Sequence, residues 1–269
     1  MTVSLDIRAL EAGYREKIVL RGLSIPSVQA GQMVALVGPN AAGKSTLLRA
    51  IAGLISACGE VRLGEKNLLA LSPAARSQLV AFMPQSLPAG RGLTVIDTVL
   101  SALRAVPASA NASGETQNDE ERAASALAKA GLLEQALQPL DRLSGGQRQL
   151  AGIAQAIVRQ PLLMLFDEPT SALDLRHQLE VMNIIRGLAR EGRIVVAVMH
   201  DLALAARYAD RVLLLHEGRV IADGTPEEAI SARTLAETYG VDARVERCSQ
   251  GFLQIIADRP INNTAQSPS

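Results

Sequence analysis

The 269-residue sequence predicts an α/β protein whose centre is a mostly parallel β-sheet. Three apolar runs without polar alternation, at residues 33–37, 162–166 and 194–199, suit strands that are buried on both faces of such a sheet. A glycine-rich segment follows the first run and leads into an apolar helical pattern at 47–51. A strand, a glycine loop and a helix in this order indicate the ligand-binding edge of an open α/β sheet.

The glycine-rich segment fits the pattern G-x-x-x-x-G-K-[ST] of a phosphate-binding P-loop, in the strand–loop–helix context that this pattern requires. Its residues are Gly38, Pro39, Asn40, Ala41, Ala42, Gly43, Lys44, Ser45 and Thr46. Successive backbone N–H groups and the positive end of the following helix can hold a polyphosphate. We expect Lys44 to reach the terminal phosphates and the Ser45 hydroxyl to bind Mg²⁺.

Two carboxylates close the second apolar run, at the edge of the sheet where open α/β proteins bind their ligands. Asp167 and Glu168 would supply one hard oxygen ligand for Mg²⁺ and one metal-free carboxylate that accepts a proton. A solvated acidic pair at a strand end is the alternative interpretation.

A second glycine-rich segment follows the P-loop by about a hundred residues and precedes an apolar helical stripe. Its residues are Leu143, Ser144, Gly145, Gly146 and Gln147. This segment resembles the signature sequence of ABC ATPases, and the resemblance extends over nearly the whole chain. It implies a P-loop NTPase core with an N-terminal antiparallel β subdomain and an inserted α-helical subdomain that carries the signature.

The resemblance also implies roles for individual residues. Asp167 matches the Walker B aspartate that holds the metal, and Glu168 matches the general base that polarises the attacking water. Ser144, Gly145 and Gly146 would face the γ-phosphate of the nucleotide on the other protomer. The remaining matches are Gln147 of the signature, Asp174 of the D-loop, Gln85 of the Q-loop (which contacts the metal and the attacking water), His200 as the switch histidine and Tyr14 as the aromatic that stacks on adenine. A surface tyrosine is the alternative for Tyr14.

Two residues depart from the family pattern. Ala41 stands where the P-loop usually has glycine, and if this position needs a positive φ, alanine costs roughly 1–2 kcal/mol. Gln155 stands where arginine is common after the signature, so a surface contact differs there. Neither residue matches a metal, base or switch position, and the ATPase prediction therefore stands.

The resemblance implies a single ABC ATPase domain over residues 2–258. Its parts would be an antiparallel β part (2–31), the P-loop core (32–85 and 161–223), the helical subdomain (86–160) and a C-terminal helix and strand (224–258), followed by a disordered tail (259–269). Residues 107–121 are polar without apolar periodicity, which predicts a mobile surface loop. The patterns at 227–239 and 252–256 predict a last helix and a last short strand.

Composition excludes several classes of protein. Lysine and arginine total 27, and so do aspartate and glutamate, so we expect no basic surface for nucleic acid. The longest apolar runs have five or six residues, far fewer than the ~20 of a membrane-spanning helix. The amino terminus does not predict a signal peptide. Cys58 and Cys248 have no metal-ligand spacing and are predicted to be ordinary thiols.

The resemblance further implies an enzyme that binds ATP and Mg²⁺ and works as a homodimer, with two ATP molecules held head to tail between two chains. With one cassette and no membrane span, the chain would be a peripheral subunit on the cytoplasmic face of the inner membrane. Its partners would be a separate polytopic permease and, through the complex, a substrate-binding protein. Residues 93–100 match the surface that receives the permease's coupling helix, with plain helical core as the alternative.

The carboxyl-terminal third is similar to the ATPases of importers for ferric siderophores, haem and cobalamin, through residues 218–228 and 235–241. We therefore predict uptake of iron–siderophore complexes, with haem, cobalamin, and zinc or manganese as alternative cargoes. A soluble ABC ATPase without a membrane partner is the alternative from another functional class. The neutral net charge and the importer-like ending favour transport.

Overall fold

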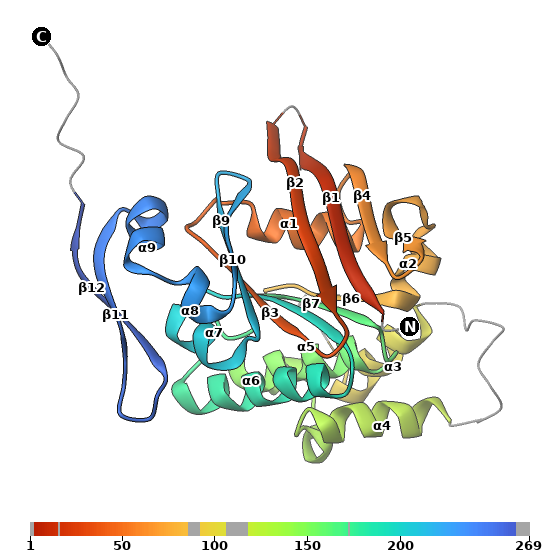
Figure 1. The fold of residues 1–269 in the computed structure, drawn as a ribbon. Helices are drawn as coiled ribbons and strands as arrows, with labels where there is room; N and C mark the ends of the chain where they lie inside the picture. The colour runs from red at the N-terminus through yellow and green to blue at the C-terminus, as the bar shows by residue number, and fades with distance from the viewer. Residues whose placement is uncertain (1–2, 16, 86–91, 106–117, 172, 262–269) are drawn as a thin grey trace, which may run out of the picture.

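The computed structural model describes residues 3–15, 17–85, 92–105, 118–171 and 173–261. Residues 107–117 of the predicted mobile loop, and the predicted tail from residue 262, lie outside the described residues. Two larger sheets, one two-stranded sheet and the helices around them make up the described part of the chain (Figure 1).

A six-stranded sheet forms the centre of the fold, in the order β10-β9-β3-β8-β7-β6. Its strands are β3 (Met33–Val37), β6 (Val80–Met83), β7 (Leu163–Asp167), β8 (Ile194–Val198), β9 (Arg211–His216) and β10 (Arg219–Gly224). Neighbours are parallel from β6 to β9, whereas β10 is antiparallel to β9. Every residue of β3, β7 and β8 is buried, as the apolar runs predict, so the mostly parallel sheet is confirmed.

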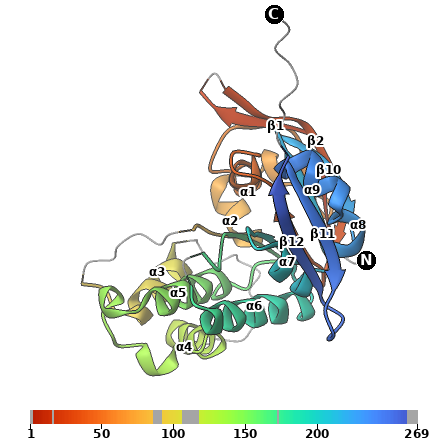
Figure 2. The same ribbon diagram turned by 90° about the vertical axis from the view of Figure 1, so that its left-hand side faces the viewer.

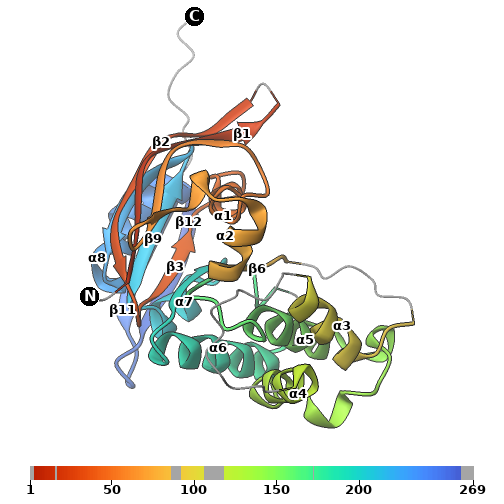
Figure 3. The same cartoon turned by 90° about the vertical axis from the view of Figure 1, so that its right-hand side faces the viewer.

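A four-stranded antiparallel sheet in the order β2-β1-β4-β5 lies to one side of the central sheet (Figure 3). Its strands are β1 (Ser4–Tyr14), β2 (Lys17–Gln29), β4 (Ala57–Leu63) and β5 (Lys66–Asn67). β1 and β2 confirm the antiparallel pair predicted near the amino terminus. β4 and β5 were predicted as part of the P-loop core instead; they belong to this sheet because β4 pairs with β1, a long-range pairing that local patterns do not reveal.

Helix α1 (Lys44–Ala52) lies between the two sheets and joins them into one core. Its Leu47, Leu48 and Ile51 are buried together with side chains of β1, β2 and the central strands. The P-loop, whose last three residues form the start of α1, is therefore fixed on both sides by packed apolar residues.

A helical region lies beyond β6, at the opposite side of the molecule from the antiparallel sheet (Figure 2). Its helices are α3 (Val95–Arg104), α4 (Asp119–Lys129) and α5 (Gly145–Ile157), with 3₁₀ turns at Leu133–Gln135 and Leu140–Arg142 between α4 and α5. α6 (Leu175–Arg190) packs beside α5 in the same core cluster. The inserted helical subdomain is therefore observed where the sequence predicts it.

The predicted mobile loop over 107–121 is too long at its carboxyl end. α4 begins at Asp119, and the Asn118 side chain caps it by accepting from the Glu120 N–H. Asp119, Glu120 and Glu121 all lie in the first turn, where acidic side chains interact favourably with the helix dipole. Polar composition alone thus hides a helix start.

The remaining helices are a 3₁₀ turn at Leu68–Ala70, α2 (Pro73–Leu79), α7 (Leu202–Tyr208), α8 (Pro226–Ala229) and α9 (Ala232–Tyr239).

The carboxyl-terminal region also differs from its prediction. The continuous helix predicted over 227–239 is wrong, because the chain leaves the helix at Ile230 and Ser231 starts α9 as a new N-cap. Ser231 and Thr234 satisfy each other's backbone N–H groups, a capping box that ends one helix and begins the next.

Strand β12 (Leu253–Pro260) is longer than the predicted strand at 252–256. It includes Arg259 and Pro260, so the start predicted for the disordered tail, residue 259, is wrong. β12 pairs antiparallel with β11 (Val241–Arg247), a strand that the sequence analysis does not predict. The pair forms a hairpin beside α9 and α7 (Figures 1 and 2).

No helix in the described parts of the chain has the length and apolar character needed to cross a membrane. Cys58 and Cys248 are both free thiols, which agrees with the prediction.

Candidate active site

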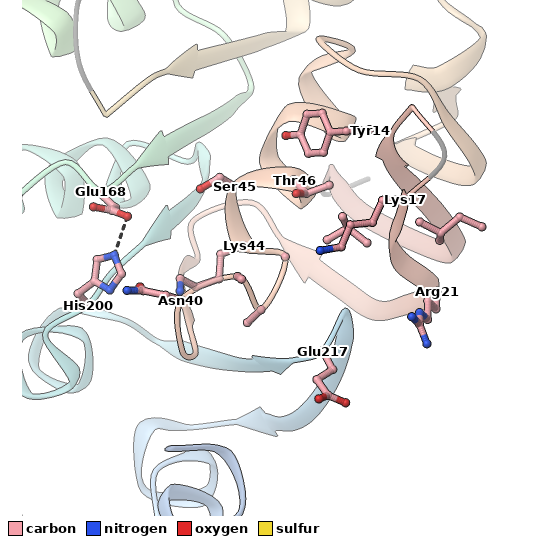
Figure 4. Close-up of a pocket in the computed structure, with 15 residues that line it drawn as sticks. Tyr14, Lys17, Arg21, Asn40, Lys44, Ser45, Thr46, Glu168, His200 and Glu217 are labelled. Carbon is pink, nitrogen blue, oxygen red and sulfur yellow. Dashed lines mark hydrogen bonds and ion pairs between the residues drawn. The ribbon is translucent and has the colours of Figure 1, made fainter. Parts of the chain in front are cut away.

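A pocket of about 600 Å³ lies over the P-loop, near the carboxyl ends of the central strands (Figure 4). This volume is within the range of roughly 300–1,000 Å³ that small-molecule sites usually have. The lining residues are Tyr14, Lys17, Ile18, Val19, Arg21, Asn40, Ala41, Ala42, Gly43, Lys44, Ser45, Thr46, Glu168, His200 and Glu217. The structure thus places most of the predicted P-loop, the predicted base, the switch histidine and the predicted adenine-stacking tyrosine around one cavity.

The backbone of the P-loop depends on two glycines. Gly38 has φ of 145°, and a Cβ there would lie 2.1 Å from the carbonyl oxygen of Leu215. Gly43 has φ of 104°, and a Cβ there would lie 2.9 Å from Leu20 Cδ2. Both positions require glycine, because the loop is packed closely between β9 and β2.

Ala41 does adopt the conformation that makes its departure from glycine costly. Its φ is 63°, in the left-handed region. An L-residue with a Cβ is disfavoured there by roughly 1–2 kcal/mol. Position 41 therefore has the positive φ on which the predicted cost depends, and the P-loop carries strain there.

Lys44 is the first residue of α1, and its ammonium group points back along the loop. Nζ donates to the carbonyl oxygens of Gly38 at 2.6 Å and of Pro39 at 2.8 Å. Burial lowers the pKa of Lys44, while Glu168 and Asp167 act in the opposite direction. A buried cation beside backbone N–H groups at a helix start is suited to bind a polyphosphate.

Ser45 and Asp167 form the part of the site that fits Mg²⁺. The Ser45 hydroxyl donates to Asp167 Oδ1 at 2.8 Å, and Asp167 is buried at the end of β7. Burial raises the pKa of Asp167, against the Ser45 hydrogen bond, which lowers it. Among the described residues no cluster of three or more His, Cys, Asp and Glu side chains could hold a metal ion by itself. A hydroxyl and one carboxylate nevertheless fit Mg²⁺, because this ion commonly takes its other ligands from phosphates and water.

Glu168 is held between two side chains from the neighbouring strands. Gln85 Nε2 donates to Glu168 Oε2 at 2.6 Å, and His200 Nε2 lies 2.6 Å from Glu168 Oε1 (Figure 4). Gln85 follows β6, Glu168 follows β7 and His200 follows β8, and these three strands are adjacent in the sheet. The three residues predicted as catalytic are therefore brought together by the parallel topology.

The backbone at Glu168 is also unusual. Its φ is 54°, a left-handed conformation that non-glycine residues rarely adopt. Such strain is found where the surrounding structure fixes a residue for a function. Here it turns the Glu168 side chain toward the pocket, while the preceding Asp167 stays buried.

Tyr14 ends β1 at the rim of the pocket, with 41% of its surface exposed. Its hydroxyl accepts a hydrogen bond of 3.2 Å from Arg49 Nη1. The ring thus has an exposed face at the pocket and a fixed hydroxyl, which fits the stacking prediction better than an unconstrained surface tyrosine.

The sequence analysis does not predict three charged residues of the pocket. Lys17 and Arg21 come from β2, and Glu217 comes from the turn between β9 and β10. Two added cations favour a polyanionic ligand. Their nearness to Tyr14 in the sequence is a signal for Lys17 and Arg21, whereas nothing local indicates Glu217.

The signature residues and the D-loop aspartate are elsewhere: Ser144, Gly145, Gly146, Gln147 and Asp174 do not line the pocket. Ser144 caps α5 in a capping box with Gln147, and Asp174 caps α6 by accepting from the His177 N–H. Ser144 and Gly145 are exposed, whereas Gly146 is buried. The chain therefore carries two groups of site residues that do not meet within it.

The ABC transporter family matches residues 21–171, which include the P-loop, the signature and Asp167–Glu168. The chain belongs to the ABC transporter family. Its domain is that of an ABC-type ATPase, and the fold prediction made from the resemblance is confirmed.

Two curated relatives extend the likeness over most of this ABC chain. The hemin import ATP-binding protein HmuV of Thermobifida fusca (strain YX) is 38% identical over 245 residues, covering 91% of this chain and 84% of the relative. The iron(3+)-hydroxamate import ATP-binding protein FhuC of Bacillus subtilis (strain 168) is 36% identical over 247 residues, covering 90% of each chain.

A solved structure gives the same result for the fold. An inward-facing ABC transporter of the metal-chelate type contains a chain that is 26% identical to this one, with a TM-score of 0.78. The match covers 96% of this chain and 98% of that chain.

Proposed function

We propose that this ABC ATPase is the ATP-binding subunit of an importer for iron chelates, with a siderophore complex as its first candidate cargo. It would act as a head-to-tail homodimer, bound peripherally to a permease on the cytoplasmic face of the inner membrane. The observation that carries the ATPase part is the position of Glu168, which is hydrogen-bonded to both Gln85 and His200 beside the P-loop.

In the proposed reaction the P-loop amides and Lys44 hold the terminal phosphates of ATP. Mg²⁺, held by Ser45 and Asp167, would neutralise the charge that develops on the phosphate oxygens. Glu168 accepts a proton from the attacking water, while Gln85 and His200 hold its two carboxylate oxygens and so orient it. Tyr14 would stack on the adenine at the rim of the pocket.

The proposed dimer follows from the separation of the two groups of site residues. Ser144 and Gly145 expose a helix N-terminus, and Asp174 starts α6 on the surface as well. A second chain in head-to-tail orientation would bring these residues to the nucleotide held by the first chain's P-loop. Its donors would then complete the electrostatic stabilisation of the transferred phosphate.

The segment at residues 93–100 contributes both to the helical core and to the proposed contact with the permease. Val95, Val99 and Leu103 are buried and pack into the helical region, so this side of α3 is core. Leu93, just before the helix, keeps 43% of its surface exposed. We place the contact with the permease's coupling helix at this exposed end of residues 93–100.

The proposed cargo is inferred from two relatives, an import ATP-binding protein for hemin and one for iron(3+)-hydroxamate. Both of these cargoes are iron chelates, and we therefore propose that chemical class. Haem, cobalamin, and zinc or manganese are the alternative cargoes. No residue of the nucleotide site chooses between them, so the choice belongs to the permease and to a substrate-binding protein.

The proposal is tested by purifying a tagged Glu168→Gln chain from native membranes with Mg-ATP and identifying the bound proteins by mass spectrometry. We expect a polytopic permease, and a parallel purification without nucleotide serves as the control. The same complex is then assembled with the unsubstituted chain and placed in liposomes, and its ATPase activity is measured with a binding protein loaded with ferric siderophore, haem or cobalamin. Recovery of soluble partners alone would contradict the importer and favour a soluble ABC ATPase.

A further inference from the structure

His177 contacts two segments that both belong to the proposed partner-facing surface, the D-loop and the signature. It lies in the first turn of α6, three residues after Asp174. Its backbone N–H donates to Asp174 Oδ1 at 2.9 Å, and its ring nitrogen Nδ1 lies 2.8 Å from the same oxygen. Because a carboxylate can only accept, Nδ1 carries the proton in this contact.

The hydrogen bonds from the His177 backbone, and then from its side chain, lower the pKa of Asp174. The carboxylate is therefore ionised at neutral pH, and the imidazole is fixed in orientation by a charge-assisted hydrogen bond. Asp174 itself is exposed, so its position depends on these contacts rather than on burial.

The other side of the His177 ring covers Gly146 of the signature. A Cβ at Gly146 would lie 2.5 Å from Cδ2 and 2.7 Å from Cγ of His177, so only glycine leaves room for the ring. Gly146 is buried, whereas Ser144 and Gly145 are exposed. The contact crosses from α6 to α5, which lie side by side (Figures 2 and 3).

We propose that His177 is a positioning residue that keeps the signature and the D-loop of one chain at a fixed spacing. The two segments then reach the nucleotide on the partner chain together, as one rigid unit. This proposal rests on the head-to-tail dimer of the proposed function. The geometry supports it because one imidazole both orients the D-loop carboxylate and packs on the signature glycine.

The test separates nucleotide binding by one chain from closure of the dimer. In the Glu168→Gln background, ATP-dependent dimerisation is followed by analytical ultracentrifugation, and the affinity of the monomer for a fluorescent ATP analogue is measured at high dilution. We expect His177→Ala to raise the dimer dissociation constant at least tenfold and to leave the monomer's nucleotide affinity within twofold. Arg176→Ala is the matched control, because Arg176 is in the same helical turn, is exposed, and pairs with Glu180 instead.

Two further variants divide the contacts of the imidazole. His177→Asn keeps a donor near the Nδ1 position for Asp174 but loses the ring over Gly146. His177→Phe keeps a ring over Gly146 but loses the donor for Asp174. If His177 links the two segments, each variant weakens dimerisation nearly as much as His177→Ala does.

Three results would overturn the proposal. If either His177→Asn or His177→Phe dimerises as tightly as the Glu168→Gln parent, a single contact suffices and His177 does not link the signature to the D-loop. If His177→Ala lowers the monomer's nucleotide affinity as much as it lowers the affinity of the dimer, His177 has a general structural role. If the Glu168→Gln parent itself stays monomeric with Mg-ATP, the dimer of the proposed function fails first, and this proposal fails with it.

Discussion

The P-loop region and the signature region hold their functional groups in opposite ways. At the P-loop, Lys44 and Asp167 are buried and hydrogen-bonded to other parts of the chain. At the signature, Ser144 and Gly145 are exposed, and Ser144 is held by a helix cap. The first region has its charged groups positioned within one chain, whereas the second presents donors to the outside. This difference agrees with the proposed catalytic site that is shared between two chains.

The largest effect in the P-loop region is expected when the proposed base is replaced. Glu168→Gln removes the proton acceptor but keeps the size of the side chain, so nucleotide binding is retained. We expect the rate of ATP hydrolysis to fall about 10²–10⁴-fold, the usual contribution of a general base. Glu180→Gln, which alters a surface ion pair, is the control and should hydrolyse ATP normally. Hydrolysis at the parent rate in the Glu168→Gln chain would remove this residue as the base.

The next largest effect is expected at Lys44. Lys44→Ala removes a buried cation from the phosphate site, and hydrogen bonds to charged groups contribute about 1.5–3 kcal/mol. We expect nucleotide affinity to fall about tenfold to a hundredfold in a titration with fluorescent ATP. Lys66→Ala, on the exposed strand β5, should bind ATP normally. Normal binding by the Lys44→Ala chain would contradict the P-loop assignment.

In the signature region we expect a smaller effect, on stability and dimerisation and not on nucleotide binding. Ser144→Ala removes the cap of α5 and should lower the free energy of unfolding by about 1 kcal/mol. It should also weaken ATP-dependent dimerisation, while the monomer's affinity for ATP is unchanged. Ser72→Ala removes the equivalent cap of α2 and should cost similar stability without weakening the dimer. A drop in monomer ATP affinity for the Ser144→Ala chain would erase the distinction between the two regions.

The smallest effect concerns strain in the P-loop. Ala41→Gly relieves a left-handed alanine and should raise the free energy of unfolding by about 1 kcal/mol, measured by urea denaturation. Ala42→Gly is the matched control at the next position, where φ is not positive, and it should destabilise the protein. A loss of stability in both variants would show that Ala41 is not strained.

The candidate nucleotide site could be predicted from the sequence through its motifs, through the family resemblance and through the positions of its residues after strands. Gln85, Glu168 and His200 each come directly after a central strand, and adjacent parallel strands bring their ends together. Their gathering at one edge of the sheet could therefore be expected, whereas their contacts with Glu168 at 2.6 Å were not predicted. Glu217 was not, because its contribution depends on where the β9–β10 turn lies against the P-loop.

The carboxyl-terminal region was predicted less well, for local reasons. The break at Ser231 depends on one capping interaction within an otherwise helical pattern. The sequence analysis does not predict β11, although this strand alternates apolar and charged residues, with Val241, Ala243 and Val245 two residues apart. The contact of His177 with Gly146 could not be predicted at all, because it depends on the packing of α6 against α5.

The position of Tyr14 has a practical consequence for spectroscopy. The chain contains three tyrosines and no tryptophan, so it has no indole fluorescence of its own. A single indole introduced by Tyr14→Trp would be the one such fluorophore in the protein, at the rim of the pocket and beside Arg49. Its emission would follow the arrival and departure of the adenine ring in real time, without a labelled nucleotide.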